Sequence, residues 1–410
     1  MSRSDEVPEE DLWERSRSDV LDERADSLME LAQRKKNADD WTLAKNLYGS
    51  ATDLYKELDR QLDAGHAIYS LGYCQYHLGE YQEAVDSLKE SLALGKELND
   101  SKVIAYSSGP LADSYSALDR HEEAISSYEL AVDAFVEIDD QVSAGINCLS
   151  LGELHGIAAR QTKALECFIR AFNIFQTGGD AIGSARAKDR MASALVELGD
   201  YMQAIEHIRD SINAFEFVEL DARVAHGHYR LGWTLNLAGK YFQAEQPLLT
   251  AIKMFRAEQD WSRAALAETQ LAYSLIFRDL EAAQPEATKI LERVASYFEA
   301  AGEIPNVLHV NSIGAERLMI AGEFLKASAI WKDILQQALE IEDHYSTRSA
   351  RVNLAECLLE TGEVKAAQEQ LGLIEAADWG ENSLELQRLE RVTTLMMSKL
   401  EESLNIDVAN

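Results

Sequence analysis

The 410-residue sequence contains little proline, with five residues beside 22 glycines. Because these two residue types interrupt helices and strands, a chain so poor in them is not rich in loops. Hydrophobic residues make up 46% of the sequence and charged residues 27%, so enough apolar material is present for a folded core. This composition predicts an almost wholly helical protein.

Long hydrophobic runs are also missing. No stretch of 18 apolar residues occurs, whereas a membrane-spanning helix needs about 20. Residues 1–19 are charged and lack the apolar centre of a signal peptide. We therefore expect a chain that is neither exported nor inserted into a membrane.

The sequence has only four cysteines, and no two of them form a CxxC pair. Each lies among apolar or small residues of a helical pattern: Cys74, Cys148, Cys167 and Cys357. This placement favours buried, reduced thiols over disulfides or a zinc site, and a reducing compartment, the cytoplasm, is predicted.

Basic residues are scarce relative to acidic ones. The chain carries 39 Lys and Arg against 71 Asp and Glu, for a formal net charge of −32. Such a surface repels nucleic-acid phosphates and anionic lipid headgroups, so neither nucleic acid nor membrane is expected as a direct partner. The acidity has two interpretations, solubility and attraction of a partner with a basic surface.

Recognisable catalytic motifs are absent. The sequence contains no Walker loop, GxGxxG, HExxH or GxSxG pattern. His226 and His228 invite a metal interpretation, but two helix positions differ in direction by about 200°, so the pair would not converge on one ion. We expect no enzyme, cofactor or metal, although periodicity cannot reveal a pocket of convergent titratable groups.

A repeated pattern fills most of the chain, and residues 71–91 show it most clearly. A small residue recurs every 40 positions, at Ala32, Gly72, Ala112, Gly152, Ala192, Gly232 and Ala272. A second small residue follows each of the first six by 12 positions, at Ala44, Ala84, Ala124, Ala164, Ala204 and Ala244. The segment 276–287 is interpreted as losing one residue at a turn, after which the pattern resumes with Ala315/Ala327 and Ala355/Ala367. These positions predict nine units, each a pair of helices.

The small residues are expected where two antiparallel helices approach closely. Left-handed turn residues are predicted between the two helices of a unit, at Gly79, Asp119, Gly199, Gly239, Asp279, Gly322 and Gly362. Between units, N-caps are predicted at Asp100, Asp140, Asp180 and Asp260. Pro305 suits the first turn of a helix.

The best unit resembles the tetratricopeptide repeat (TPR) signature. The matching positions are Leu71, Gly72, Gly79, Tyr81, Ala84 and Leu88. The 40-residue period is longer than the usual 34, and it is similar to the long-helix variety of kinesin light chains, spindle-orientation adaptors and bacterial peptide-pheromone receptors. The resemblance implies an all-α, right-handed α-solenoid. The sequence departs from the signature by lacking a closing proline in each unit. Pro110, Pro247 and Pro285 are expected to kink, shorten or disturb their helices.

The expected organisation has three parts: a polar tail and leading helix over 1–21, a repeat array over 22–377, and a C-terminal segment over 378–410. The units are expected at 22–61, 62–100, 101–140, 141–180, 181–221, 222–260, 261–303, 304–343 and 344–377. A continuous helical pattern covers 9–36. A last helix, at about 384–404, is interpreted as a cap, with a dimerisation or partner helix as the alternative.

The resemblance also places candidate binding residues, because the first helices of TPR arrays line the concave face. The groove positions lie six and three before the small residue and one, four and five after it. In the second unit they are His66, Tyr69, Tyr73, Tyr76 and His77. In the sixth unit they are His226, Tyr229, Trp233, Asn236 and Leu237. The resemblance would set these two sets on facing walls, although aromatic residues at such positions also serve as packing between helices.

A basic cluster lies in the fifth unit, at Arg186, Lys188, Asp189 and Arg190. Arg186 and Arg190 could hold a carboxylate of a peptide, or they could be solvated surface charges. Arg223 and Arg230 would extend the cluster.

The functional expectation is a non-catalytic adaptor that binds a peptide or protein segment in the concave groove. The alternative is a peptide-sensing regulator whose superhelix changes shape on binding. Self-association through the terminal units or the last helix also remains open.

Overall fold

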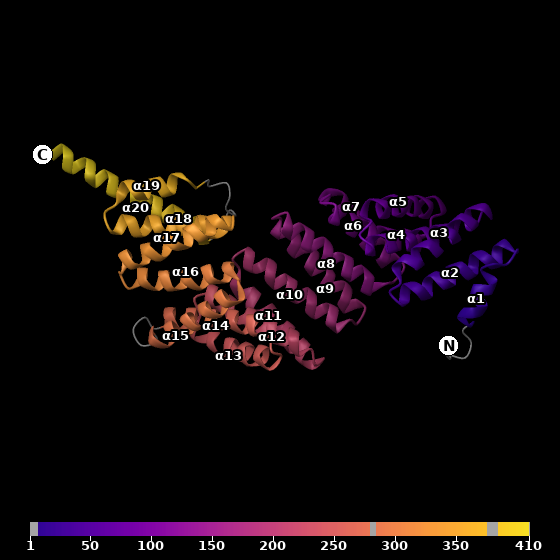
Figure 1. The fold of residues 1–410 in the computed structure, drawn as a ribbon, viewed down its shortest axis with the longest axis horizontal. Helices are drawn as coiled ribbons and strands as arrows, with labels where there is room; N and C mark the ends of the chain where they lie inside the picture. The colour runs from indigo at the N-terminus through magenta and orange to yellow at the C-terminus, as the bar shows by residue number, and fades with distance from the viewer. Residues whose placement is uncertain (1–6, 279–283, 375–383, 410) are drawn as a thin grey trace. The chain divides into compact units, whose positions relative to one another are not determined.

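The computed structural model describes residues 7–278, 284–374 and 384–409, and over these residues it contains helices and no strand (Figure 1). This confirms the all-α prediction. The helices are α1 Glu9–Arg15, α2 Leu21–Asn37, α3 Trp41–Glu57, α4 Gln61–His77, α5 Tyr81–Leu98, α6 Ser101–Ala117, α7 His121–Glu137, α8 Gln141–Ile157, α9 Gln161–Thr177, α10 Ala181–Glu197, α11 Tyr201–Phe217, α12 Asp221–Leu237, α13 Tyr241–Ala257, α14 Trp261–Arg278, α15 Gln284–Ala301, α16 Ile304–Ile320, α17 Phe324–Glu340, α18 His344–Glu360, α19 Val364–Gly372 and α20 Leu384–Ala409.

The chain divides into two compact units, which we call the N-terminal unit, Met1–Arg190, and the C-terminal unit, Met191–Asn410. The division falls inside α10. Over the described residues, α2 to α19 form consecutive pairs, each with a first and a second helix. Most of these helices have 17 residues and are joined by turns of three, which produces the 40-residue period.

The turns share one backbone geometry. Their middle residue is left-handed: Gly79, Gly199, Gly239, Gly322 and Gly362 have φ between 68° and 85°, and Asp119 has φ 56°. These six turn predictions are confirmed, while Asp279 lies outside the described residues. The next N–H donates to the carbonyl five positions back, as from Glu80 to Gln75 at 2.9 Å. This bond satisfies a carbonyl that the end of a helix would otherwise leave without a partner.

The predicted N-caps are also confirmed. Asp100 accepts a hydrogen bond from the backbone N–H of Val103 at 2.8 Å, and Asp140, Asp180 and Asp260 make the equivalent bond three residues ahead. Each cap satisfies one of the free N–H groups of a helix N-terminus. Pro305 lies in the first turn of α16, as predicted.

Small residues occupy the points where paired helices touch. A Cβ atom built on Gly72 would lie 2.5 Å from Cγ of Leu88, and one on Gly232 would lie 2.4 Å from Cγ of Leu248. The alanines at the equivalent positions, such as Ala32 and Ala112, are fully buried. The predicted reason for the small residues, close helix approach, is therefore confirmed.

The seventh pair differs from its prediction. Ala315 follows Ala272 by 43 residues, so this pair gains three residues and the predicted loss of one is wrong. Both α14 and α15 have 18 residues, and the segment between them, 279–283, lies outside the described residues. The small residue of α15 is the fully buried Ala287.

None of the three prolines shortens its helix. Pro110 lies inside α6 and Pro247 inside α13, and both helices keep the common length of 17 residues. Shortening, one of the two effects predicted for Pro110, therefore does not occur, because both helices pack tightly against their neighbours and this packing outweighs the loss of one backbone donor. Pro285 is the second residue of α15, where a missing N–H costs little, so it does not disturb the helix interior.

The helix predicted over 9–36 is broken into α1 and α2. The hydroxyl of Ser16 donates to the carbonyl of Trp13, and the hydroxyl of Ser18 accepts from the N–H of Val20, so these local bonds replace helical ones. Leu12 of α1 is 2% exposed and belongs to the same core as Leu28. Helix α1 therefore covers the first pair.

The last helix, α20, packs against α18 and α19, as predicted for a cap. Val392 is buried, and Leu389, Leu395 and Met396 pack on the core of the last pairs. The helix ends at Ala409, five residues beyond the predicted end, and the side chain of Leu400 lies outside the described part. This packing gives the array a closing helix with a largely polar outer face.

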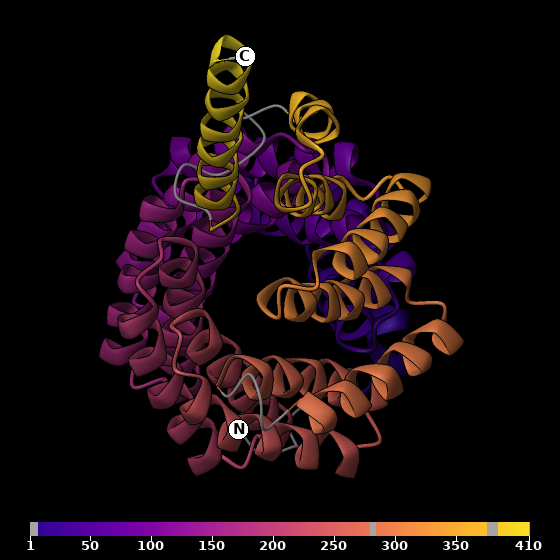
Figure 2. The same ribbon diagram turned by 90° about the vertical axis from the view of Figure 1, so that its left-hand side faces the viewer.

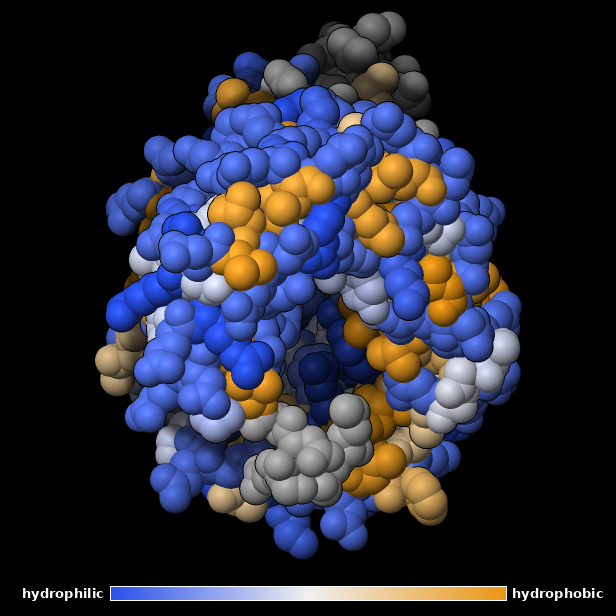
Figure 3. All heavy atoms as spheres, turned by 90° about the vertical axis from the view of Figure 1, so that its right-hand side faces the viewer, coloured by the Kyte–Doolittle hydropathy of each residue, from blue (hydrophilic) through white to orange (hydrophobic). Residues whose placement is uncertain are grey.

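Most of the surface visible in Figure 3 is hydrophilic, with separate apolar patches. Within the described ranges, no helix has the length and apolar composition that a membrane crossing requires.

All four cysteines are free thiols, with Cys167 half-buried and the other three buried. Burial raises the pKa of Cys74 and Cys167 to about 11 and that of Cys148 and Cys357 to about 12. The predicted burial is therefore confirmed for three thiols, and all four hold little of the reactive thiolate form near neutral pH.

We expect these thiols to react slowly with Ellman's reagent at pH 8. A rise in pKa of two to three units lowers the thiolate fraction roughly 100- to 1000-fold, so the native protein should react at least about 100-fold more slowly than the protein in urea. Absorbance at equal protein concentration measures both rates. A thiol that reacts in the native protein as fast as in urea would contradict the packing described for the cysteines.

A second prediction concerns Gly232. Gly232→Ala should lower the free energy of unfolding by about 1–3 kcal/mol, because its methyl group would overlap Leu248. The matched control is Gly314→Ala, also inside a helix but with no neighbouring atom within 4 Å of the added Cβ. The control should be neutral or stabilising by up to about 1 kcal/mol. Urea unfolding compares the variants, and equal shifts for both would contradict the close-approach explanation.

Candidate functional site

The first helices line the inner side of each compact unit. Several successive first helices contact one another, α4 with α6 in the N-terminal unit and α12 with α14, α14 with α16 and α16 with α18 in the C-terminal unit, whereas no contact of that extent joins successive second helices in the described residues. In the C-terminal unit the pairs follow one another in an arc (Figure 2). A concave face built from first helices follows from this arrangement.

In the N-terminal unit, the five predicted residues of α4 form two groups of ring contacts, His66 with Tyr69, and Tyr73 and Tyr76 with His77, which we call together the aromatic cluster of α4. His66, Tyr69, Tyr73 and Tyr76 are half-buried, and His77 is exposed. Trp41 of α3 stacks on His77 with the ring centroids 4.1 Å apart. Loss of hydration raises the pKa values of Tyr69, Tyr73 and Tyr76.

These rings mainly contact one another. Tyr73 lies edge-on to Trp41 at 5.9 Å, and Tyr69 stacks on Tyr106 of α6 at 5.6 Å. Packing between helices therefore accounts for much of the cluster, while its edge at His77 remains open to solvent.

The basic cluster of α10 is partly neutralised within the same unit. Arg186 and Arg190 are exposed, and the Nε of Arg190 lies 2.8 Å from a carboxylate oxygen of Glu153. Lys188 lies over the ring of Phe172. Exposed pairs of this kind contribute at most about 1 kcal/mol to stability.

In the C-terminal unit, Arg230 is 8% exposed and donates a hydrogen bond to the hydroxyl of Ser193 at 2.8 Å. The prediction that Arg230 extends an exposed basic surface is therefore wrong, because its side chain is buried. Arg223 is exposed.

The predicted residues of α12 divide into two groups. His226, Tyr229, Trp233 and Leu237 are half-buried, whereas Asn236 is 4% exposed. The amide of Asn236 donates to the backbone carbonyl of Gln270 at 3.0 Å and accepts from the hydroxyl of Ser274 at 2.7 Å. The prediction of an exposed Asn236 is therefore wrong, because bonds to α14 hold this side chain in the wall.

A cavity of about 620 Å³, which we call the upper cavity, opens on the concave face of the C-terminal unit. Its walls come from the first helices α12, α14, α16 and α18, with contributions from α17 and α20. Among the predicted residues, Trp233, Asn236 and Leu237 line it, while His226 and Tyr229 do not. A volume of this size is typical of ligand-binding pockets.

Several residues of this cavity were not predicted, although the same positions of the repeat identify them. Tyr273 and Glu316 each follow the small residue of a first helix by one position, as Trp233 does, and Glu356, which does not line the upper cavity, has the same position in α18. His309 and Ser349 lie six positions before the small residue. The groove positions counted from the small residue, if applied to the seventh, eighth and ninth units as well, would have identified these residues.

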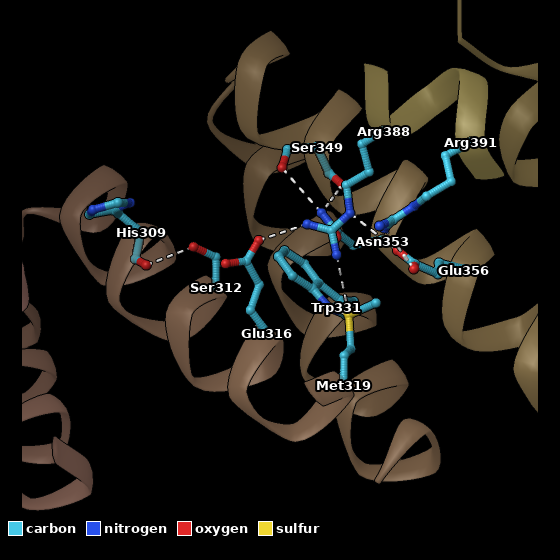
Figure 4. Close-up of polar contacts among 10 residues, drawn as sticks. All are labelled: His309, Ser312, Glu316, Met319, Trp331, Ser349, Asn353, Glu356, Arg388 and Arg391. Atoms are coloured by element: carbon cyan, nitrogen blue, oxygen red, sulfur yellow. Dashed lines mark hydrogen bonds and ion pairs between the residues drawn. The ribbon is translucent and has the colours of Figure 1, made fainter. Parts of the chain in front are cut away.

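Two carboxylates on successive first helices face α20 (Figure 4). Arg388 of α20 donates from Nη1 to Glu316 at 2.8 Å and from Nε to Glu356 at 3.1 Å. Arg391 also donates to Glu356, at 2.9 Å. Tyr273, Glu316 and Arg388 also line a second cavity of about 660 Å³, which we call the lower cavity.

Other polar groups complete the wall of the upper cavity. Asn353 is 2% exposed, and its amide nitrogen donates to the carbonyl of Ser349 at 2.8 Å, while its Oδ1 has no hydrogen-bond partner. The Nε2 atoms of Gln270 and His309 lie 3.3 Å apart, and desolvation lowers the pKa of His309 even though its ring meets the cavity. Aromatic faces, amides and carboxylates of this kind suit recognition of a polypeptide.

Among the residues that the structure describes, no group of three or more His, Cys, Asp and Glu side chains could hold a metal ion.

Family models and solved structures agree with this architecture. Residues 29–97 and 111–134 match models of the tetratricopeptide repeat. No curated protein matches the sequence. Apo RapI is 16% identical, with a TM-score of 0.54 over 85% of this chain and 98% of that one. Aspartyl phosphate phosphatase F from Bacillus subtilis is 14% identical, with a TM-score of 0.54 over 90% and 96%.

The apo form of the quorum sensor NprR from B. thuringiensis is 15% identical, with a TM-score of 0.53 over 79% of this chain and 90% of that one. At such identities the likeness extends to the fold alone. Together with the repeated helix pairs, these findings show an all-α solenoid fold, with matches to the tetratricopeptide repeat over residues 29–97 and 111–134.

Proposed function

We propose that this protein is a non-catalytic adaptor that binds a peptide or protein segment in the upper cavity of its C-terminal unit. The observation that carries the proposal is the convergence of four successive first helices on one concave cavity. A polypeptide lying there would contact several repeats in succession, which gives a geometric basis for reading its sequence.

Trp233 and Tyr273 are the proposed apolar anchors. Both side chains are half-buried and line the upper cavity from neighbouring first helices. Rigid aromatic rings lose little conformational freedom when a partner binds, and for this reason they dominate many peptide interfaces. The buried side chains of Asn236 and Asn353 form part of the cavity wall beside these two anchors.

The aromatic cluster of α4 is proposed as a second contact surface, through the exposed edge at His77. We place the protein in the cytoplasm because its thiols are free and embedded in helix packing. A net charge of −32 favours protein partners with basic surfaces and disfavours nucleic acid.

A regulatory alternative has one specific observation in its favour. Arg388 joins the separate helix α20 to carboxylates of α16 and α18 beside the cavity, so a ligand entering there would meet α20 directly. In that case the protein would be a peptide sensor in which binding moves α20. X-ray scattering with and without a bound peptide separates the two functions, since a sensor changes shape and a passive adaptor does not.

The adaptor proposal predicts that cavity aromatics are required for peptide binding. Peptides are first selected on the wild-type protein from a random display library, and their affinities are then measured by fluorescence anisotropy. Replacing both Trp233 and Tyr273 by alanine should weaken binding by at least about 30-fold, corresponding to about 2 kcal/mol for loss of central anchors.

The matched control is Trp261→Ala, since Trp261 is a 54% exposed tryptophan of the same unit that does not line either cavity. Its affinity should equal that of the wild type, and circular dichroism should show that both variants keep their helices. Selected peptides that bind the double variant with wild-type affinity would refute the proposed site, as would a selection that yields no binding peptide.

A further inference from the structure

Arg388 fills a site made of hydrogen-bond acceptors from two helices, α16 and α18 (Figure 4). Its guanidinium donates to Glu316 of α16 at 2.8 Å and to Glu356 of α18 at 3.1 Å. Its Nη2 lies 3.9 Å from the sulfur of Met319, which in turn accepts from the indole N–H of Trp331 at 3.2 Å. The fork of donors of a guanidinium suits this arrangement.

The two carboxylates are shielded from water. The side chains of Glu316 and Glu356 are 25% and 17% exposed, and that of Arg388 is 26% exposed. A carboxylate in such surroundings needs a cation, because an unpaired charge away from water is costly. The site therefore selects for a positively charged occupant.

The cation comes from outside the repeats. In the N-terminal unit, acidic residues also follow the small residue of a first helix by one position, and their partners belong to the repeats. Asp113 accepts from the hydroxyl of Tyr128, and Glu153 pairs with Arg190 of the next first helix. Glu316 and Glu356 are instead paired by α20, which follows the last pair and does not continue the 40-residue period.

Arg388 also lies where the upper and lower cavities meet, since it lines both together with Tyr273 and Glu316. A polypeptide that occupies both cavities must move the Arg388 side chain. This movement takes the Arg388 cation away from Glu316 and leaves Glu356 with the exposed Arg391 alone, unless the incoming segment supplies a cation of its own.

An independent sign of an incomplete site comes from Asn353. This side chain lines the upper cavity, is 2% exposed, and carries an amide oxygen without a hydrogen-bond partner. Buried acceptors normally have a donor, so an unmet one in a cavity wall indicates a position for a ligand donor.

We propose that the cavity binds a partner segment through an arginine side chain, which replaces Arg388 between Glu316 and Glu356. This inference rests on the proposed adaptor function and specifies the chemistry of its partner. Arg388 then acts as an internal competitor that holds the acidic site while no partner is bound. The net charge of −32 adds a long-range attraction for such a basic segment.

The test uses the full chain and three variants. Peptides are selected from a random display library, on the wild-type protein and separately on Arg388→Ala, and each selected arginine is then replaced by citrulline, a neutral side chain of nearly the same shape. Fluorescence anisotropy gives the affinity of each labelled peptide. The matched control is Arg278→Ala, which removes the same charge from an ion pair with Glu245 outside both cavities.

We expect Arg388→Ala to bind arginine peptides about tenfold more tightly than the wild type, because no internal competitor must be displaced. Citrulline should weaken binding by tenfold or more, and Glu316→Gln in the Arg388→Ala background should remove the preference for arginine. Arg278→Ala should match the wild type.

Three results would overturn the inference. In the first, peptides need Trp233 and Tyr273 for binding but have the same affinity with arginine or citrulline. This result would refute the arginine site without contradicting the adaptor function. If Arg388→Ala lowers the melting temperature of the protein without any gain in affinity for arginine peptides, Arg388 only fastens α20. A selection that yields no peptide on either protein would refute the adaptor function as well.

Discussion

The hydrogen bond that closes each turn is the constraint on which the rest of this structure depends. In turn after turn, an N–H reaches the carbonyl five residues back across a left-handed residue, as from Asp40 to Lys35 at 3.0 Å and from Lys240 to Leu235 at 2.8 Å. This hydrogen bond fixes the direction in which the chain leaves one helix and starts the next. Helices of equal length are therefore paired with the same geometry along the chain. The recurring contact of small residues, and the concave faces of first helices, follow from that regularity.

Much of the fold could be predicted because the forces that shape it are local. Gly72 and Gly232 contact the partner helix of their own pair, so sequence spacing alone reveals their role. The break at Ser16 and the longer seventh pair depend on the residues of particular turns. A period common to all units does not reveal such local differences. The division within α10 left no trace in the sequence, because the period continues unchanged from Gly152 to Ala192.

The candidate site was less predictable because it depends on contacts between pairs. Trp233 and Leu237 lie in the cavity wall, but the burial of Asn236 is determined by Gln270 and Ser274 of the following pair. Glu316 and Glu356 occupy the position expected for a groove residue, but the groove prediction covered only the second and sixth units. The cation that joins them comes from α20, whose placement no repeat pattern specifies.

The attachment of α20 has a consequence for how the array loses structure. In a solenoid each pair contacts mainly its neighbours, so the end can fray one pair at a time. Arg388 bonds to α16 and α18, and Lys399 donates to the carbonyl of Leu359 at 2.8 Å, so α20 crosses from the last pair to the one before it. The eighth and ninth pairs are thereby linked into one cooperative block, and stepwise fraying from the C-terminal end is suppressed.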